Sequence, residues 1–200
     1  MDGNQIFHGG VLPVSKLEKL QVLSLSNNSL GRPKKTNAPP GGKSSSARTK
    51  KQSASLSTLS NDSAIPSLPP TLKQLKLDSN HFSSIPPSIY SPTLTKLYKL
   101  DFSNNNLATV PMEISNLVAL AELNLDNNMI VSLPETIGQL TKLKALSLRN
   151  NQIQITSTSF SDKNPQPLPA ELFSETPLID LNLGGNRMTN TQLVSVPMDN

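Results

Sequence analysis

The chain holds few residues that could carry out nucleophilic, acid–base or metal chemistry. It has two histidines and no cysteine in 200 residues. Neither His8 nor His81 has a second histidine or a cysteine at the spacing of metal ligands. We therefore expect no bound metal and no nucleophile activated by a histidine.

One short string is similar to a phosphate-binding loop but lacks part of its pattern. Gly42-Lys43-Ser44 matches the end of G-x-x-x-x-G-K-S, whose first glycine would fall at Asn37. The segment also lacks the strand before it and the helix after it that such loops need. Carboxylates recur elsewhere, but on an open surface without the enclosed site that tunes acid–base groups. The sequence thus predicts no enzyme activity and no cofactor.

The residues that must position any functional surface are repeated leucines and asparagines. LAELNLDNNMI, Leu120–Ile130, reads L-x-x-L-x-L-x-x-N-x-L, and copies begin 23 residues earlier at Leu97 and 23 residues later at Leu143. Further copies begin at Leu20, Leu72 and Leu178. Repeats of this length predict a solenoid, in which each coil packs only on its neighbours.

The repeats divide the chain into five segments. Residues 1–30 hold a first, partial repeat with a weak N-terminal cap, residues 67–155 hold the regular repeats, and residues 168–200 hold the last repeat and a C-terminal tail. Residues 31–66 and 156–167 interrupt the period as insertions. We expect one long insertion at 31–66 and no hidden repeat, because no asparagine-centred copy is readable there.

The first insertion differs from the rest of the chain in composition. Residues 31–66 are rich in Gly, Pro, Ser and Lys, and carry seven cations against Asp62 alone. Such a segment buries too little apolar surface to fold, so we predict a disordered loop. As alternatives, the segment could bind nucleic acid or anionic lipid, or serve as a nuclear-import signal. The segment has no aromatic residue for base stacking.

Each repeat predicts one short strand followed by a polar turn. Apolar residues alternate with polar ones, which is the period of a strand with one buried face, and one strand per coil gives a parallel sheet. The inward pairs are Leu75/Leu77, Leu100/Phe102, Leu123/Leu125, Leu146/Leu148 and Leu181/Leu183. The asparagines after the strands are Asn28, Asn80, Asn105, Asn128, Asn151 and Asn186. Their amides can pair backbone groups of successive coils that would otherwise be buried without partners.

The other half of each coil predicts a short helical turn on the opposite side of the solenoid. Ile114/Leu117 and Ile137/Leu140 have the three-residue spacing of a helical face. A proline precedes each pair, and proline is favoured at the start of a helix. We expect one or two turns of α or 3-10 helix per coil.

The outward strand residues are the candidate partner-binding surface. They include Lys76, Asp78, Lys99, Asp101, Glu122, Asn124, Asp126, Ser147, Arg149 and Asp180. In-register coils would place three pairs of opposite charges side by side: Lys76 with Asp101, Lys99 with Glu122, and Asp126 with Arg149. The face is either a solvated surface with laterally paired charges or a recognition surface. Arg149 is the best candidate anchor, since interfaces favour Trp, Tyr and Arg.

The repeat unit resembles a known family. From Leu12 to about Met188, outside the insertions, the chain follows L-P-x-x-I-x-x-L-x-x-L-x-x-L-x-L-x-x-N-x-L. This unit is similar to that of intracellular leucine-rich-repeat proteins of the Ras-suppressor, scribble and plant Ras-group type. The resemblance implies an α/β leucine-rich-repeat solenoid, a curved right-handed coil stack with a parallel β-sheet on its concave face. It also implies a scaffold that binds other proteins, often in signalling.

Two further expectations concern the whole protein. The chain is expected to act as a monomer in the cytoplasm, with the nucleus open, because it has no cysteine, no signal-peptide pattern and no run of about 20 apolar residues. The alternative function is a repeat arm of a larger signalling enzyme or receptor, truncated at both ends. The sequence names no partner or pathway.

Overall fold

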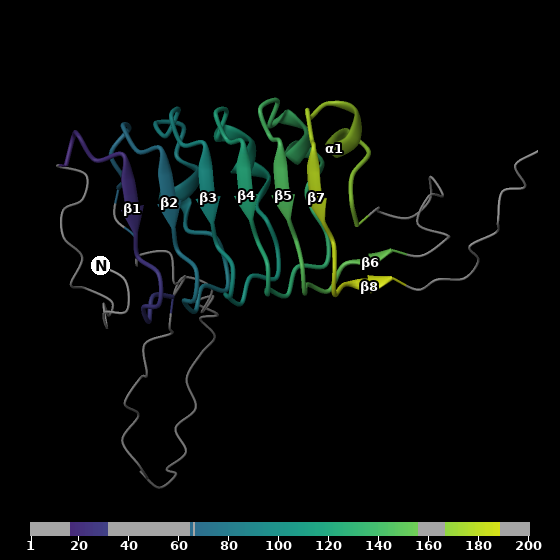
Figure 1. The fold of residues 1–200 in the computed structure, drawn as a ribbon. Helices are drawn as coiled ribbons and strands as arrows, with labels where there is room; N and C mark the ends of the chain where they lie inside the picture. Colours follow the sequence, from purple (N-terminus) through teal and green to yellow (C-terminus); the bar gives the residue numbers. More distant parts are fainter. Residues whose placement is uncertain (1–16, 32–64, 66, 156–166, 189–200) are drawn as a thin grey trace, which may run out of the picture.

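A six-stranded, all-parallel sheet runs the length of the molecule (Figure 1). The computed structural model describes residues 17–31, 65, 67–155 and 167–188. The strands, in their order across the sheet, are β1 (Val22–Ser24), β2 (Gln74–Lys76), β3 (Lys99–Asp101), β4 (Glu122–Asn124), β5 (Ala145–Ser147) and β7 (Asp180–Asn182). The central leucine of each strand faces the central leucine of the next, from Leu23 to Leu181.

Short helical turns form a second layer behind the sheet (Figure 1). They are the 3-10 helices η3 (Pro87–Tyr90), η4 (Met112–Asn116) and η5 (Glu135–Gln139), and the α-helix α1 (Glu171–Ser174). The prolines Pro111 and Pro134 lie just before η4 and η5, and their carbonyls accept the first helical hydrogen bonds at 3.1 and 3.0 Å. The prediction of one strand and one short helical turn per coil is confirmed for these coils.

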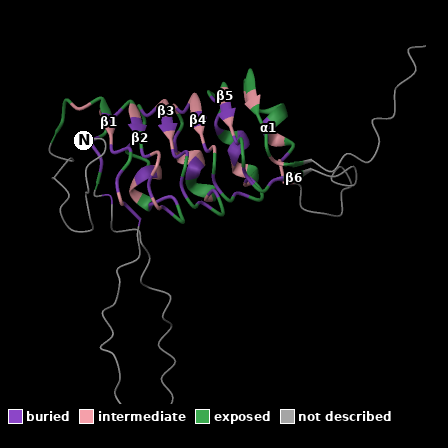
Figure 2. Cartoon of the chain, turned by 60° about the horizontal axis from the view of Figure 1, so that its bottom comes forward, coloured by how far each residue is buried: buried purple, intermediate pink, exposed green. Residues whose placement is uncertain are grey.

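Buried apolar residues of the two layers form one core cluster. Figure 2 shows the buried stretches of the strands and helical turns in purple. Leu75, Leu100 and Leu123 are at most 2% exposed. Phe82 and Phe102 are also buried and meet edge to face, with ring centroids 5.6 Å apart. Leu181 and Leu183 also pack on this core but stay half-buried, because no further coil covers them in the described part of the chain.

Side-chain amides bridge successive coils where the strands end. Nδ2 of Asn128 donates to the Phe102 carbonyl of the preceding coil at 3.0 Å and to the Leu125 carbonyl of its own coil at 3.0 Å. Its Oδ1 accepts the backbone N–H of Leu107 at 2.9 Å. Asn80, Asn105, Asn151 and Asn186 make equivalent bonds to the coil before them. We call these five residues and Asn28 the asparagine ladder.

The residue before each ladder asparagine adopts a left-handed backbone. It is Asn27, Ser79, Asn104, Asn127 or Asn150, with φ between 54° and 57°, and Gly185 in the last coil, with φ 75°. Asparagine and glycine tolerate this conformation better than other residues. The requirement explains why most copies carry an Asn-Asn doublet, a recurrent signal to which the sequence argument gave no role.

A second, two-stranded sheet continues the last coils. β6 (Gln154–Ile155) pairs in parallel with β8 (Arg187–Met188), beyond the asparagine turns. The sequence pattern did not predict this pair. The main sheet is continuous across both interruptions of the repeat period, since β1 pairs directly with β2 and β5 with β7.

Several expectations fall mainly outside the described residues. The predicted disorder of the basic insertion concerns residues 32–64 and 66, the second insertion concerns residues 156–166, and the chain ends concern residues 1–16 and 189–200. The segment boundaries and the proposed roles of the basic loop therefore stay predictions.

Candidate functional site

The outward strand residues form one continuous polar surface, which we call the sheet face. It comprises Val22, Ser24, Ser26, Gln74, Lys76, Asp78, Lys99, Asp101, Ser103, Glu122, Asn124, Asp126, Ala145, Ser147, Arg149, Asp180, Asn182 and Gly184. Because the strands are parallel and in register, each position of the repeat forms a row across the sheet. All ten candidate partner-binding residues lie in these rows.

The acidic and amide side chains at the strand ends are held by nearby backbone. Oδ1 of Asp101 accepts the backbone N–H of Ser103 at 2.9 Å and its hydroxyl at 2.7 Å. Oδ1 of Asn124 accepts the N–H of Asp126 at 3.1 Å. These bonds fix the orientation of the side chains before any partner arrives, which lowers the entropy cost of binding.

Asp126 links two neighbouring coils. Its Oδ1 accepts the Ser147 hydroxyl at 2.6 Å and the backbone N–H of Arg149 at 2.8 Å. The predicted ion pair with the Arg149 guanidinium does not form among the described residues. The predicted Lys76–Asp101 pair is likewise absent there, because Asp101 turns towards Ser103 instead. Arg149 is consequently exposed and its guanidinium is unpaired in this region.

One of the three predicted charge pairs does form. Lys99 Nζ lies 2.5 Å from Glu122 Oε2, and the two side chains are 40% and 46% exposed. The hydrogen bond that Lys99 donates to Glu122 raises the pKa of Lys99 above its ordinary value of 10.5, against the opposing effect of desolvation. Since the pair is well solvated, its contribution to stability is small.

The pair gives a pH-dependent prediction. Replacing Glu122 with glutamine is expected to lower the free energy of unfolding by less than about 1 kcal/mol at neutral pH and low salt. A cation whose pKa is raised on folding stabilises the folded state fully at pH values below its pKa in the unfolded chain. This stabilisation is lost as the pH rises through its pKa in the folded protein. Urea titrations of both proteins should therefore converge at strongly alkaline pH and at molar salt. A difference in the free energy of unfolding that changes with neither pH nor salt would contradict an ionic origin.

A shallow depression lies on the sheet face around β5. It has a volume of ≈ 130 Å³, and its rim includes Lys99, Glu122 and Asp180 around Ala145. Register places Glu122 and Asp180 on either side of Ala145, whose small side chain forms the floor. Within the described residues the Asp180 carboxylate makes no hydrogen bond or ion pair, so it is free to meet an incoming cation.

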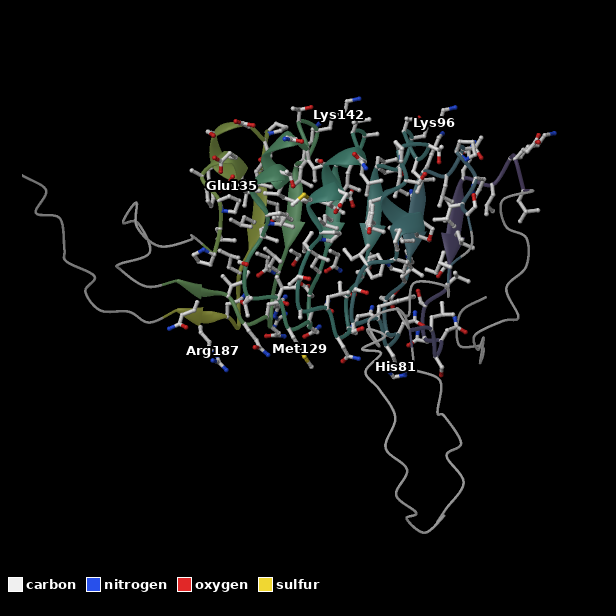
Figure 3. The ribbon with its side chains drawn as sticks, turned by 180° about the vertical axis from the view of Figure 1, so that it is seen from behind. His81, Lys96, Met129, Glu135, Lys142 and Arg187 are labelled. Carbon is white, nitrogen blue, oxygen red and sulfur yellow. The ribbon has the colours of Figure 1, made fainter. Side chains whose placement is uncertain are left out.

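The side chains that could bind a metal are not clustered in the described part of the chain. No three His, Cys, Asp or Glu side chains are grouped closely enough there to hold a metal ion. His81 lies in the turn after Asn80, where its backbone N–H donates to the Leu30 carbonyl at 2.9 Å. It lies at the edge of the solenoid where the strands end, away from the sheet face (Figure 3). His8 and the Gly42-Lys43-Ser44 string are outside the described residues.

Comparison with known proteins agrees with this geometry. Leucine-rich-repeat family models match residues 70–130 and 19–40. A leucine-rich-repeat protein of Leptospira interrogans superposes with a TM-score of 0.51 at 26% identity, covering 88% of this chain and 40% of that one. The chain is a leucine-rich-repeat solenoid. An internalin of Listeria monocytogenes shares the fold, with a TM-score of 0.51 at 18% identity over 89% of this chain and 45% of the internalin.

These matches define the fold and the limits of the comparison. The leucine-rich-repeat chain spans less than half the length of either solved protein. The matching models are those of leucine-rich repeats in general and do not single out the Ras-suppressor, scribble or plant Ras-group type. Leucine-rich-repeat domains commonly bind other proteins, typically without catalysis. Among the described helices, none combines the length and apolar character needed to cross a bilayer.

Proposed function

We propose that this leucine-rich-repeat chain is a non-catalytic scaffold that captures another protein on its sheet face. The observation that carries the proposal is the continuous polar surface over six parallel strands, on which Asp101, Asn124 and Asp126 are already fixed by hydrogen bonds. A rigid, broad and open surface suits a protein partner, whereas small molecules favour enclosed pockets.

The charge of the face indicates the kind of partner. The sheet face carries three cations, Lys76, Lys99 and Arg149, against five carboxylates, Asp78, Asp101, Glu122, Asp126 and Asp180. An excess of carboxylates favours a basic segment on the partner, because complementary charge steers encounter and selects partners. The free Asp180 carboxylate beside the Ala145 depression is the best place for a partner's lysine or arginine.

Filling the depression should block capture without unfolding the solenoid. Ala145→Arg places a long cation between Glu122 and Asp180, at an outward position where the core is not disturbed. The variant is expected to retain less than about one tenth of the wild-type capture of its partner from extracts of the source cells, which corresponds to a loss of about 1.4 kcal/mol. Bound proteins are identified and quantified by mass spectrometry.

The chain offers a matched control at the other end of the same row. Val22 occupies in β1 the position that Ala145 occupies in β5, and it is 53% exposed. Val22→Arg adds the same charge to the same face, so capture should stay near the wild-type level. Arg149→Glu is expected to weaken capture as a second variant, because the loss of this exposed anchor side chain outweighs the attraction that one more carboxylate adds for a basic segment. Full capture by Ala145→Arg and Arg149→Glu would move the partner site away from this face.

The place and pathway of action are also part of this proposal. We place the scaffold inside the cell and in signalling, on the absence of cysteine and the resemblance of its L-P and V-P repeat units to Ras-suppressor, scribble and plant Ras-group proteins. Fractionation of cells that express the tagged full chain tests the location. Recovery mainly from the extracellular medium would contradict it.

A further inference from the structure

Lysines gather on one edge of the solenoid, where the chain turns from the helical layer into the sheet. We call this edge, residues 17–21, 69–73, 94–98, 117–121, 140–144 and 175–179, the lysine edge. Its cations are Lys19, Lys73, Lys96, Lys142 and Lys144, all exposed. Lys96 and Lys142 both extend away from the body at this edge (Figure 3).

The sheet topology produces this row. Since all six strands are parallel and in register, the segments before them lie together at one end of the sheet. Neighbouring strands are about 4.8 Å apart, so the lysines from the first to the fifth coil span about 20 Å. The fourth coil supplies none, because Ala119 and Ala121 take the equivalent positions.

The edge differs in charge from the rest of the described solenoid. It carries its five lysines against two carboxylates, those of Glu18 and Glu175. The other described residues carry four cations against eight carboxylates. The field of the folded repeats is therefore strongly uneven, and the lysine edge is its positive side.

Exposed apolar side chains lie on the same edge. Leu17 is 50% exposed, Val118 52% and Ile179 82%, and none of the three belongs to the buried core. The one aromatic residue of the edge, Tyr98, is half-buried and its hydroxyl is bonded to Gln74. The edge thus combines cations with apolar groups and has no free ring on which a nucleic-acid base could stack.

We propose that the lysine edge docks the solenoid onto the surface of an anionic lipid bilayer. A row of lysines meets the negative headgroups, and the apolar side chains in and at the ends of this row enter the boundary with the acyl chains. A nucleic-acid strand would use the charge but not Leu17, Val118 or Ile179. In this orientation the sheet stands upright on the bilayer, which leaves the sheet face open to a protein partner.

The test is co-sedimentation of the full chain with vesicles. Vesicles of phosphatidylcholine containing about one-third phosphatidylserine are expected to bind the chain, with affinity falling as salt is raised, and pure phosphatidylcholine vesicles are not. The edge variant Lys96→Glu/Lys142→Glu/Lys144→Glu is expected to bind at least about tenfold more weakly. Val118→Ser/Ile179→Ser should also weaken binding, by a smaller factor, without changing the net charge.

A matched control separates the edge from overall charge and from the basic insertion. The control variant is Lys76→Glu/Arg149→Glu/Arg187→Glu, which reverses three exposed cations outside the lysine edge. Both this variant and the edge variant leave residues 31–66 unchanged. Vesicle binding of the control variant should stay within about twofold of the wild type. Equal losses in both variants, or no loss in either, would overturn the proposal, as would capture of single-stranded RNA without capture of vesicles. Circular dichroism and thermal melting check that all variants are folded.

Discussion

Replacing Asn128 with alanine is expected to lower the free energy of unfolding by about 2–4 kcal/mol. The substitution leaves the buried N–H of Leu107 without an acceptor, since Oδ1 of Asn128 is its partner at 2.9 Å. It also removes the donors to the carbonyls of Phe102 and Leu125, each of which keeps one bond from another ladder asparagine. The loss is large against the roughly 5–15 kcal/mol that stabilises a typical domain.

Urea unfolding followed by far-UV circular dichroism measures this loss. Asn106→Ala is the control, because Asn106 is exposed and its side chain makes no hydrogen bond in the described residues. That change should stay within about 0.5 kcal/mol of the wild type. Asn128→Asp should be at least as damaging as Asn128→Ala at neutral pH, because a carboxylate oxygen would face carbonyl oxygens. Equal stability of Asn128→Ala and Asn106→Ala would show that the ladder bonds contribute little.

Phe102→Ala is expected to destabilise the solenoid by about 3–5 kcal/mol. Phe102 is fully buried and packs edge to face on Phe82, at an interplanar angle of 75°. The truncation leaves a cavity between the second and third coils. Coils of a solenoid contact only their neighbours, so no distant part of the structure can collapse to fill it.

Phe102→Leu gives an internal comparison for this position. Leucine occupies the equivalent site in the neighbouring coils, as at Leu77 and Leu125, so this variant should lose only about 1–1.5 kcal/mol. Met112→Ala, at a side chain 63% exposed, is the surface control and should change stability by less than about 0.5 kcal/mol. Similar losses for Phe102→Ala and Met112→Ala would mean that the core between these coils is not well packed.

The sequence by itself determined the repeat, the direction of its strands and the depth of its leucines. A fixed 23-residue period with alternating leucines leaves one arrangement that buries every apolar pair, which is a stack of parallel coils. Leu75, Leu100 and Leu123 are accordingly buried in the centre of their strands.

Other features depended on how side chains compete for partners at close range. Asp126 has Arg149 as its neighbour in the next coil, yet it bonds the backbone N–H of Arg149 and the Ser147 hydroxyl. Asp101 likewise accepts hydrogen bonds from the N–H and hydroxyl of Ser103 and does not pair with Lys76. Hydrogen bonds to a nearby, fixed backbone need no ordering of a long cationic side chain, and a repeat pattern does not reveal that difference in entropy.

Only the tertiary structure decided where the depression and the lysine edge lie. The depression over Ala145 exists because register places a small side chain between Glu122 and Asp180. The lysine edge exists because parallel strands bring five lysines from four separate coils to one end of the sheet. The repeat pattern specifies each coil separately, whereas these surfaces arise from the alignment of different coils, which forms only when the chain has folded.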